Sequence, residues 1–118
     1  MKKTLTLFTL FAAMLIAFSC KKDNRPYKLT VQVYINDSLV VQNALVRVYA
    51  PVENSFIDYY SYTNGNGESE FEFPNKAILE IEAGKSGYKG CNYVELERGT
   101  RNVRVDMFYY TDPKTGCK

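Results

Sequence analysis

Carboxylates, cysteines and tyrosines are the side chains through which this sequence could do chemistry, because its 118 residues include no histidine. Histidine is the most frequent general base near neutral pH and the commonest metal ligand. A catalytic site would therefore have to be built from carboxylates, Lys, Tyr or Ser. The ten tyrosines and three cysteines are the residues to place first.

Glutamates alternate along two apolar segments and would put several carboxylates on one face of a sheet: Glu68, Glu70, Glu72, Glu80 and Glu82. Paired carboxylates can cleave glycosides, so a small hydrolase is the third and least favoured function. Outward glutamates at period two are also what a solvated strand face requires, and they protect a sheet edge. We therefore expect no catalytic residues and no enzyme.

The segment NGNGE at residues 64–68 offers oxygen ligands at alternating positions. Calcium loops usually need several carboxylates, and this segment has only Glu68. Its two Asn-Gly steps are the strongest short signal for a β-hairpin, and the hairpin explains both glycines. We expect no metal and no cofactor.

Cys20 closes a short apolar segment, residues 5–19, that follows Lys2 and Lys3. This segment is too short to span a bilayer, which takes about 20 apolar residues, and its pattern is typical of a secretory signal. The run IAFSC at residues 16–20 resembles the lipobox of bacterial lipoproteins. The resemblance implies that residues 1–19 are removed, that Cys20 is acylated, and that the exported protein is held at the bacterial outer membrane. Exposure on the cell surface stays open.

Removal of the signal leaves one small domain. Without Lys2 and Lys3, the basic and acidic side chains balance at 13 each, so we expect no nucleic-acid partner. Residues 20–26 are predicted to be a tether. The basic residues in and beside it could touch anionic head groups or remain solvated.

Cys91 and Cys117 remain after Cys20 is assigned to lipid. Export would place them in an oxidising compartment, where an even pair can form a bridge. We expect a disulfide, which would stabilise the domain by roughly 3 kcal/mol in the chain-entropy model. The alternative is two reduced thiols, with Cys91 buried and Cys117 frayed in a tail at residues 111–118.

Apolar residues alternate with polar ones along most of the remaining chain, as in half-buried strands. Turn signals recur at short intervals, a loop is expected at residues 84–90, and no segment has helical periodicity. This pattern predicts an all-β domain at residues 27–110: a single antiparallel β-sandwich. The predicted strands number about seven: residues 27–35, 44–50, 56–63, 68–73, 77–83, 92–97 and 103–107.

The order of several short motifs resembles the carboxypeptidase regulatory-like modules. The motifs are NALVRVY at residues 43–49, TNGNGE at 63–68, FEF at 71–73, LEIEA at 79–83 and KSGY at 85–88. The resemblance implies a transthyretin-like (prealbumin-like), Ig-like sandwich. Such modules occur as accessory domains of exported enzymes, outer-membrane transporters and surface proteins.

Tyrosines gather on two predicted strands and form the candidate binding surface: Tyr59, Tyr60, Tyr62, Tyr109 and Tyr110. Exposed aromatic rings can stack on sugar rings or anchor a protein partner. Alternatively, these rings only pack on the sheet or shield its edge.

We therefore expect a non-enzymatic, membrane-anchored lipoprotein that acts as a structural or protein-interaction module at the cell envelope. The alternative is a glycan-binding surface module that uses the exposed tyrosines. The expected partners are the membrane, through lipid on Cys20, and a protein of the envelope or a glycan.

Overall fold

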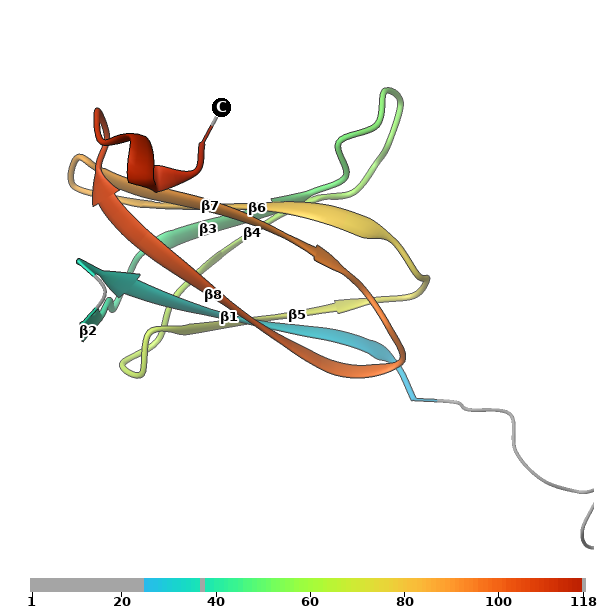
Figure 1. Ribbon diagram of the computed structural model, residues 1–118. Coiled ribbons are helices and arrows are strands. Elements are labelled where there is room, and N and C mark those ends of the chain that lie inside the picture. The colour runs from blue at the N-terminus through green and yellow to red at the C-terminus, as the bar shows by residue number, and fades with distance from the viewer. Residues whose placement is uncertain (1–24, 37, 118) are drawn as a thin grey trace, which may run out of the picture.

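The computed structural model describes residues 25–36 and 38–117, and this part of the chain is all-β apart from one short 3-10 turn (Figure 1). The predictions for Cys20, for the signal and for most of the tether lie outside the described residues. The elements are β1 (Tyr27–Ile35), β2 (Leu39–Val40), β3 (Leu45–Tyr49), β4 (Asp58–Tyr62), β5 (Glu68–Phe73), β6 (Ile78–Lys85), β7 (Tyr88–Glu95), β8 (Gly99–Tyr109) and the 3-10 turn η1 (Pro113–Thr115).

The strands curl into two facing layers (Figure 1). In one layer, β1 pairs with β8 on one side and with β5 and β2 on the other; the second layer has the order β7-β6-β3-β4. The end of β8 pairs with the start of β7, so the two layers form one continuous sheet. The fold is therefore a curled half-barrel.

The predicted antiparallel arrangement is wrong for the central pair of strands. β1 and β8 run parallel along all nine residues of β1, from Tyr27 opposite Gly99 to Ile35 opposite Met107. The sheet is mixed, since its other pairings are antiparallel. Parallel neighbours need a long connection, and here the whole of the second layer lies between β1 and β8 in the chain.

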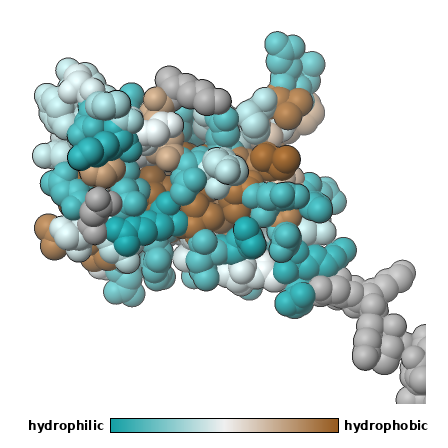
Figure 2. All heavy atoms as spheres, in the orientation of Figure 1, coloured by the Kyte–Doolittle hydropathy of each residue, from teal (hydrophilic) through white to brown (hydrophobic). Residues whose placement is uncertain are grey.

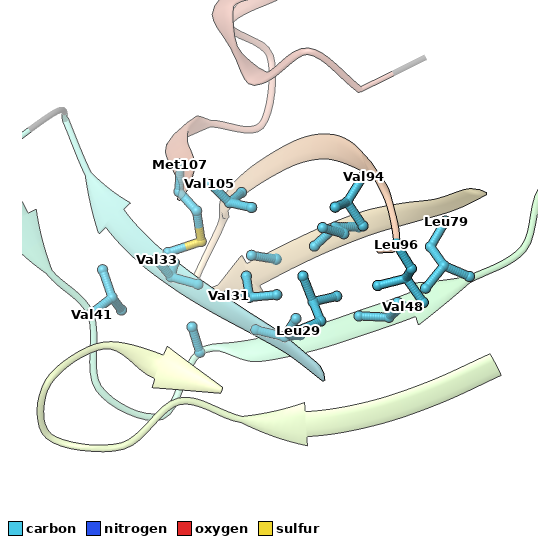
Figure 3. Close-up of a cluster of buried hydrophobic side chains, with 14 of the residues drawn as sticks. Leu29, Val31, Val33, Val41, Val48, Leu79, Val94, Leu96, Val105 and Met107 are labelled. Atoms are coloured by element: carbon cyan, nitrogen blue, oxygen red, sulfur yellow. The ribbon is translucent and has the colours of Figure 1, made fainter. Parts of the chain in front are cut away.

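The alternation in the sequence fixes which side chains face the space between the layers. Figure 3 shows side chains from β1, β3, β6, β7 and β8 directed into one cluster, and Figure 2 shows apolar atoms gathered between more polar surfaces. Burying each large side chain contributes roughly 1.5–3 kcal/mol before the cost of ordering the chain. The largest fully buried side chains are Leu29, Leu79, Ile81, Leu96, Met107, Val31, Val33, Val46, Val48 and Val105.

The loop predicted at residues 84–90 is wrong, because β6 and β7 continue through it. Lys85 pairs with Tyr88, which leaves only Ser86 and Gly87 as the turn. Both have positive φ, 50° and 84°, and two successive positive φ values define the type I′ turn that joins tightly paired strands. Gly90 lies within β7, where an added Cβ would collide with the carbonyl oxygen of Asp106 on β8.

A buried hydroxyl ties two loops together beside the core. Thr63, directly after β4, is 2% exposed. Its Oγ1 accepts a hydrogen bond from the backbone N–H of Ala44 at 2.9 Å and donates one to the carbonyl oxygen of Val41 at 2.5 Å. This side chain therefore satisfies two backbone groups between β2 and β3.

The predicted disulfide between Cys91 and Cys117 is confirmed. Before it, Asp112 caps η1 by accepting a hydrogen bond from the N–H of Lys114 at 2.9 Å. The bridge holds the C-terminal segment against β7, so the segment from residue 111 to 117 is not a free tail. No helix within the described ranges is both long and apolar enough to cross a membrane.

Candidate functional site

One outer surface of the molecule combines exposed aromatic rings with charged groups. It is the side of β4, β3, β6 and β7 that faces away from the core, and we call it the outer aromatic face. Val46 and Val48 point inward, so their neighbours on β3 and the residues in register with these point outward. The outer aromatic face comprises Leu45, Arg47, Tyr49, Asp58, Tyr60, Tyr62, Ile78, Glu80, Glu82, Gly84, Lys89, Cys91 and Tyr93.

Arg47 organises the centre of this face. Its Nε and Nη2 donate to the two carboxylate oxygens of Asp58 at 2.9 and 3.1 Å. Its guanidinium carbon lies 4.2 Å from the ring centroid of Tyr49 and 5.8 Å from that of Tyr60. The hydrogen bonds to Asp58 raise the pKa of Arg47 and lower the pKa of Asp58 below its ordinary value. Arg47 is thus held as a fixed cation between two rings.

Tyr49 connects this cation to two carboxylates on β6. Its hydroxyl lies 2.7 Å from Oε2 of Glu80 and 3.2 Å from Oε1 of Glu82. The hydrogen bond to Glu80, helped by partial burial, raises the pKa of Tyr49 above its ordinary value. Because its pKa is raised, the phenol of Tyr49 stays neutral, and its single hydroxyl proton remains available for a hydrogen bond to these carboxylates.

Two hollows lie on the outer aromatic face. The first, of about 580 Å³, has Glu80 and Glu82 in its lining, with Tyr49 and Tyr93 beside them. We call it the acidic hollow. The second, of about 530 Å³, is lined by Gly84 together with apolar and basic side chains, and we call it the glycine hollow. Its other lining residues are Leu45, Arg47, Tyr60, Glu82, Ala83, Lys85, Ser86, Lys89, Cys91 and Cys117.

The disulfide lies between the two hollows. Cys91 lines both of them; Gly116 lines the acidic hollow and Cys117 the glycine hollow. The backbone at Gly116 comes so close to Cys91 that a Cβ there would lie 3.2 Å from the Cys91 carbonyl oxygen. Gly116 and Cys117 therefore border the two neighbouring hollows, one each.

The structure separates the five tyrosines of the predicted binding surface into three places. Tyr60 and Tyr62 lie on the outer aromatic face, 58% and 66% exposed. Tyr59 points to the other side of β4, where its ring packs edge-on against that of Phe73 on β5, with 5.4 Å between the ring centroids. Tyr109 and Tyr110 lie at the end of β8, where β8 pairs with β7, and their ring centroids are 4.8 Å apart.

Sequence reasoning missed several residues of this face. Tyr93 is 72% exposed beside Glu80, and Tyr49 lies on the other side of the same glutamate. The parity of each strand already places these side chains outward. Their grouping depends on the register between β3, β6 and β7, which a single sequence does not reveal.

The opposite outer surface, formed by β5, β1 and β8, has a different character. Lys28 lies opposite Glu72, and Gln32 donates a hydrogen bond to Glu68 at 3.1 Å. Thr100, Asn102 and Arg104 continue this surface on β8. It is mostly polar. Arg104 pairs there with Asp106 on the same strand at 2.8 Å and lies 3.9 Å from the ring centroid of Tyr34 on β1.

Among the residues that the structure describes, no three or more His, Cys, Asp or Glu side chains are grouped so that they could hold a metal ion. Glu68, Glu70 and Glu72 lie on β5, in the first layer, whereas Glu80 and Glu82 lie on β6, in the second. The five glutamates of the sequence therefore belong to two different surfaces.

Comparisons with known proteins define this chain at the level of its fold. No family model matches the sequence, and no curated protein matches it. A solved structure of the Bacillus anthracis TIE protein is similar, with a TM-score of 0.56 and 16% sequence identity over 72% of this chain. This chain spans 17% of the length of that structure. At this identity the likeness concerns the all-β fold alone.

Proposed function

We propose that this protein is a non-enzymatic binding module of the bacterial cell envelope, exported and held at the outer membrane by lipid on Cys20. In this proposal its outer aromatic face contacts a protein partner. The lipobox-like sequence at residues 16–20 supports the anchor. The Cys91–Cys117 disulfide supports an oxidising compartment.

The difference between the two outer surfaces carries this proposal. One surface is polar, whereas the outer aromatic face exposes Tyr60, Tyr62, Tyr93 and Ile78 at 58–72%. Protein interfaces are enriched in tyrosine and arginine, and a few such anchors supply most of the binding energy. An ordered Arg47 between two tyrosine rings fits that composition.

The finer fold class belongs to the same proposal. Two layers with a shared core are compatible with the transthyretin-like sandwich of carboxypeptidase regulatory-like modules. In this chain the layers would be joined through β8 and the mixed pairing with β1.

Two measurements test the function. The first is metabolic labelling of the full chain with radioactive palmitate, where we expect incorporation into the wild type and none into Cys20→Ser. The second is photo-crosslinking in cells from position 60 on the outer aromatic face and from position 70 on the opposite surface. We expect a discrete protein adduct from position 60 only. Equal adducts from both positions, or none from position 60, would contradict the proposal.

The arrangement around Glu80 favours glycan binding as the second candidate. Tyr49 and Tyr93 lie on strands at either side of this glutamate, and all three line the acidic hollow. Sugar rings stack on aromatic faces while carboxylates accept hydrogen bonds from their hydroxyls. A glycan array should then show binding that Tyr93→Ala abolishes and Tyr109→Ala leaves intact. Absence of binding by the wild type would remove this candidate.

A further inference from the structure

Gly84 has no evident structural reason to be glycine. It lies inside β6, in register with Leu45 on β3 and Lys89 on β7. Its φ is outside the left-handed range, and an added Cβ would meet only the carbonyl oxygen of Tyr88 at 3.7 Å, an ordinary contact. Glycine inside a strand is destabilising by roughly 0.5–1 kcal/mol relative to alanine.

Gly90 on the adjacent strand provides the contrast. There, a Cβ would overlap the backbone of Asp106 and the side chain of Val105, so packing against β8 requires glycine. At Gly84 the missing side chain instead leaves space on the outer aromatic face. That space is part of the glycine hollow.

The charges around this hollow indicate an anionic occupant. Lys85, Lys89 and Arg47 line it, against one carboxylate, that of Glu82. Lys85 is oriented by a hydrogen bond from Nζ to the carbonyl oxygen of Gln42 at 2.5 Å. Arg47 is already engaged by Asp58. Lys89, in register with Gly84, is therefore the first cation available to an incoming anion, and the ammonium of Lys85 keeps two donor hydrogens beyond the one that Gln42 accepts.

Apolar side chains continue from one side of the hollow. Leu45 and Tyr60 belong to its lining, and Tyr62 lies opposite Leu45 on β4. Together they extend the contact surface beyond what one small ion would cover. A chain that places an acidic group in the hollow can lay its neighbouring residues on these rings.

We propose that the glycine hollow binds a carboxylate side chain from an acidic segment of the partner protein. This rests on the proposed function and names the chemistry of the partner at that surface. Lys85 and Lys89 pair with the carboxylate, the backbone at Gly84 gives it room, and Tyr60 and Tyr62 contact the residues beside it. Glu82 and the disulfide border the hollow.

The test is a titration of the isotope-labelled full chain, reconstituted in nanodiscs of neutral lipid and observed by NMR. The probe is a triglutamate peptide with blocked ends, and the comparison is the corresponding triglutamine peptide. We expect saturable shifts of the amide signals of Gly84, Ser86 and Lys89 with triglutamate only. Added salt should weaken the binding, because partly exposed charges are screened.

Gly84→Val places a branched side chain in the hollow directly beside Lys89, with a residue that strands favour. We expect it to raise the dissociation constant at least about tenfold while leaving the unfolding midpoint unchanged or higher. Gly65→Ala is the control, because nothing lies within 4 Å of a Cβ at that exposed position. Lys89→Gln should weaken binding more than Lys76→Gln, since Lys76 pairs with Glu95 away from the hollow.

Several results would overturn the inference. These are the absence of saturable shifts at the three amides, undiminished binding by a folded Gly84→Val protein, and equal binding of glucuronate or inorganic phosphate. The last would assign the hollow to another anion source. If the position-60 adduct persists in Gly84→Val, this inference is rejected and the proposed function stands. If the protein without the Gly84 substitution forms no adduct, the proposed function itself is rejected.

Discussion

Arg47 shows how one residue can order a surface without being buried. It pairs bidentately with Asp58, lies 3.8 Å from a carboxylate oxygen of Glu82, and covers the ring of Tyr49. An exposed ion pair contributes little by itself, because water and salt screen it. Its effect here is geometric, since it brings two tyrosine rings to within 4.2 and 5.8 Å of one guanidinium carbon.

The first prediction concerns acid. The pKa of Asp58 is lowered mainly by its hydrogen bonds to Arg47, so the pair stabilises the fold at neutral pH. Stability from a depressed carboxylate pKa is present above the unfolded value of about 3.9 and is lost as pH falls through the folded value. Asp58→Asn should therefore lower the urea midpoint slightly at pH 7, and the difference from wild type should shrink below pH 4.

The control for this prediction is the same substitution in an Arg47→Met background. There, Asp58→Asn should no longer change the midpoint in a pH-dependent way. A difference that persists at low pH would mean that Asp58 acts through something other than its charge.

The second prediction concerns Thr63. Thr63→Val removes the hydroxyl that the backbone of Ala44 and Val41 uses, while the side-chain shape stays similar. Leaving buried polar groups without partners costs about 1–3 kcal/mol, so the free energy of unfolding should fall by that amount. Thr63→Ser keeps the hydroxyl and should lose clearly less. Equal losses in urea unfolding would show that the methyl group matters instead.

At the scale of elements, two glycines in the same hairpin should respond in opposite ways. Gly90→Ala forces β7 away from β8 and should destabilise the fold by about 1–3 kcal/mol. Gly84→Ala meets no obstacle and should leave stability unchanged or raise it by up to about 1 kcal/mol. Chemical denaturation of the two variants decides this. Similar destabilisation by both would remove the argument that Gly84 is kept for its open space.

The strands themselves could be predicted from the sequence because period-two alternation is a local signal. It correctly selected the inward side of β1, β3 and β6. It failed where polar and glycine residues continue a strand, as in the β6–β7 hairpin at residues 84–90. Ser86 and Gly87 form a two-residue turn. The other two glycines of that segment, Gly84 and Gly90, are paired strand residues, although frequent glycine is locally typical of a loop.

The pairing of β1 with β8 could not be read from either strand, because both alternate in the same way for parallel and antiparallel neighbours. The candidate site was missed for the same reason. Tyr49, Tyr93 and Glu80 come from three strands, and only their register brings them together. Abundant tyrosine indicated a binding surface but not which rings share it.

At the scale of the whole molecule, the disulfide joins Cys117 to the middle of β7, the outermost strand of the second layer on the side of β8. The loop that it closes spans a sequence separation of 26 residues. Cys117→Ser should therefore lower the free energy of unfolding by roughly 3 kcal/mol in the chain-entropy model. Intact mass before and after reduction should differ by two hydrogens. An unchanged mass would contradict the bridge.

The course of β8 has a consequence for orientation. Its first residue, Gly99, lies beside Tyr27, where the described chain enters the sheet, and its last, Tyr109, lies beside Tyr88 at the tip of the β6–β7 hairpin. Eleven extended residues cover about 33 Å. Gly84 lies one residue pair from that tip. If the domain is tethered through its N-terminal end, the tip and the glycine hollow lie at the end of β8 that is remote from the tether, on the side open to a partner from outside the membrane.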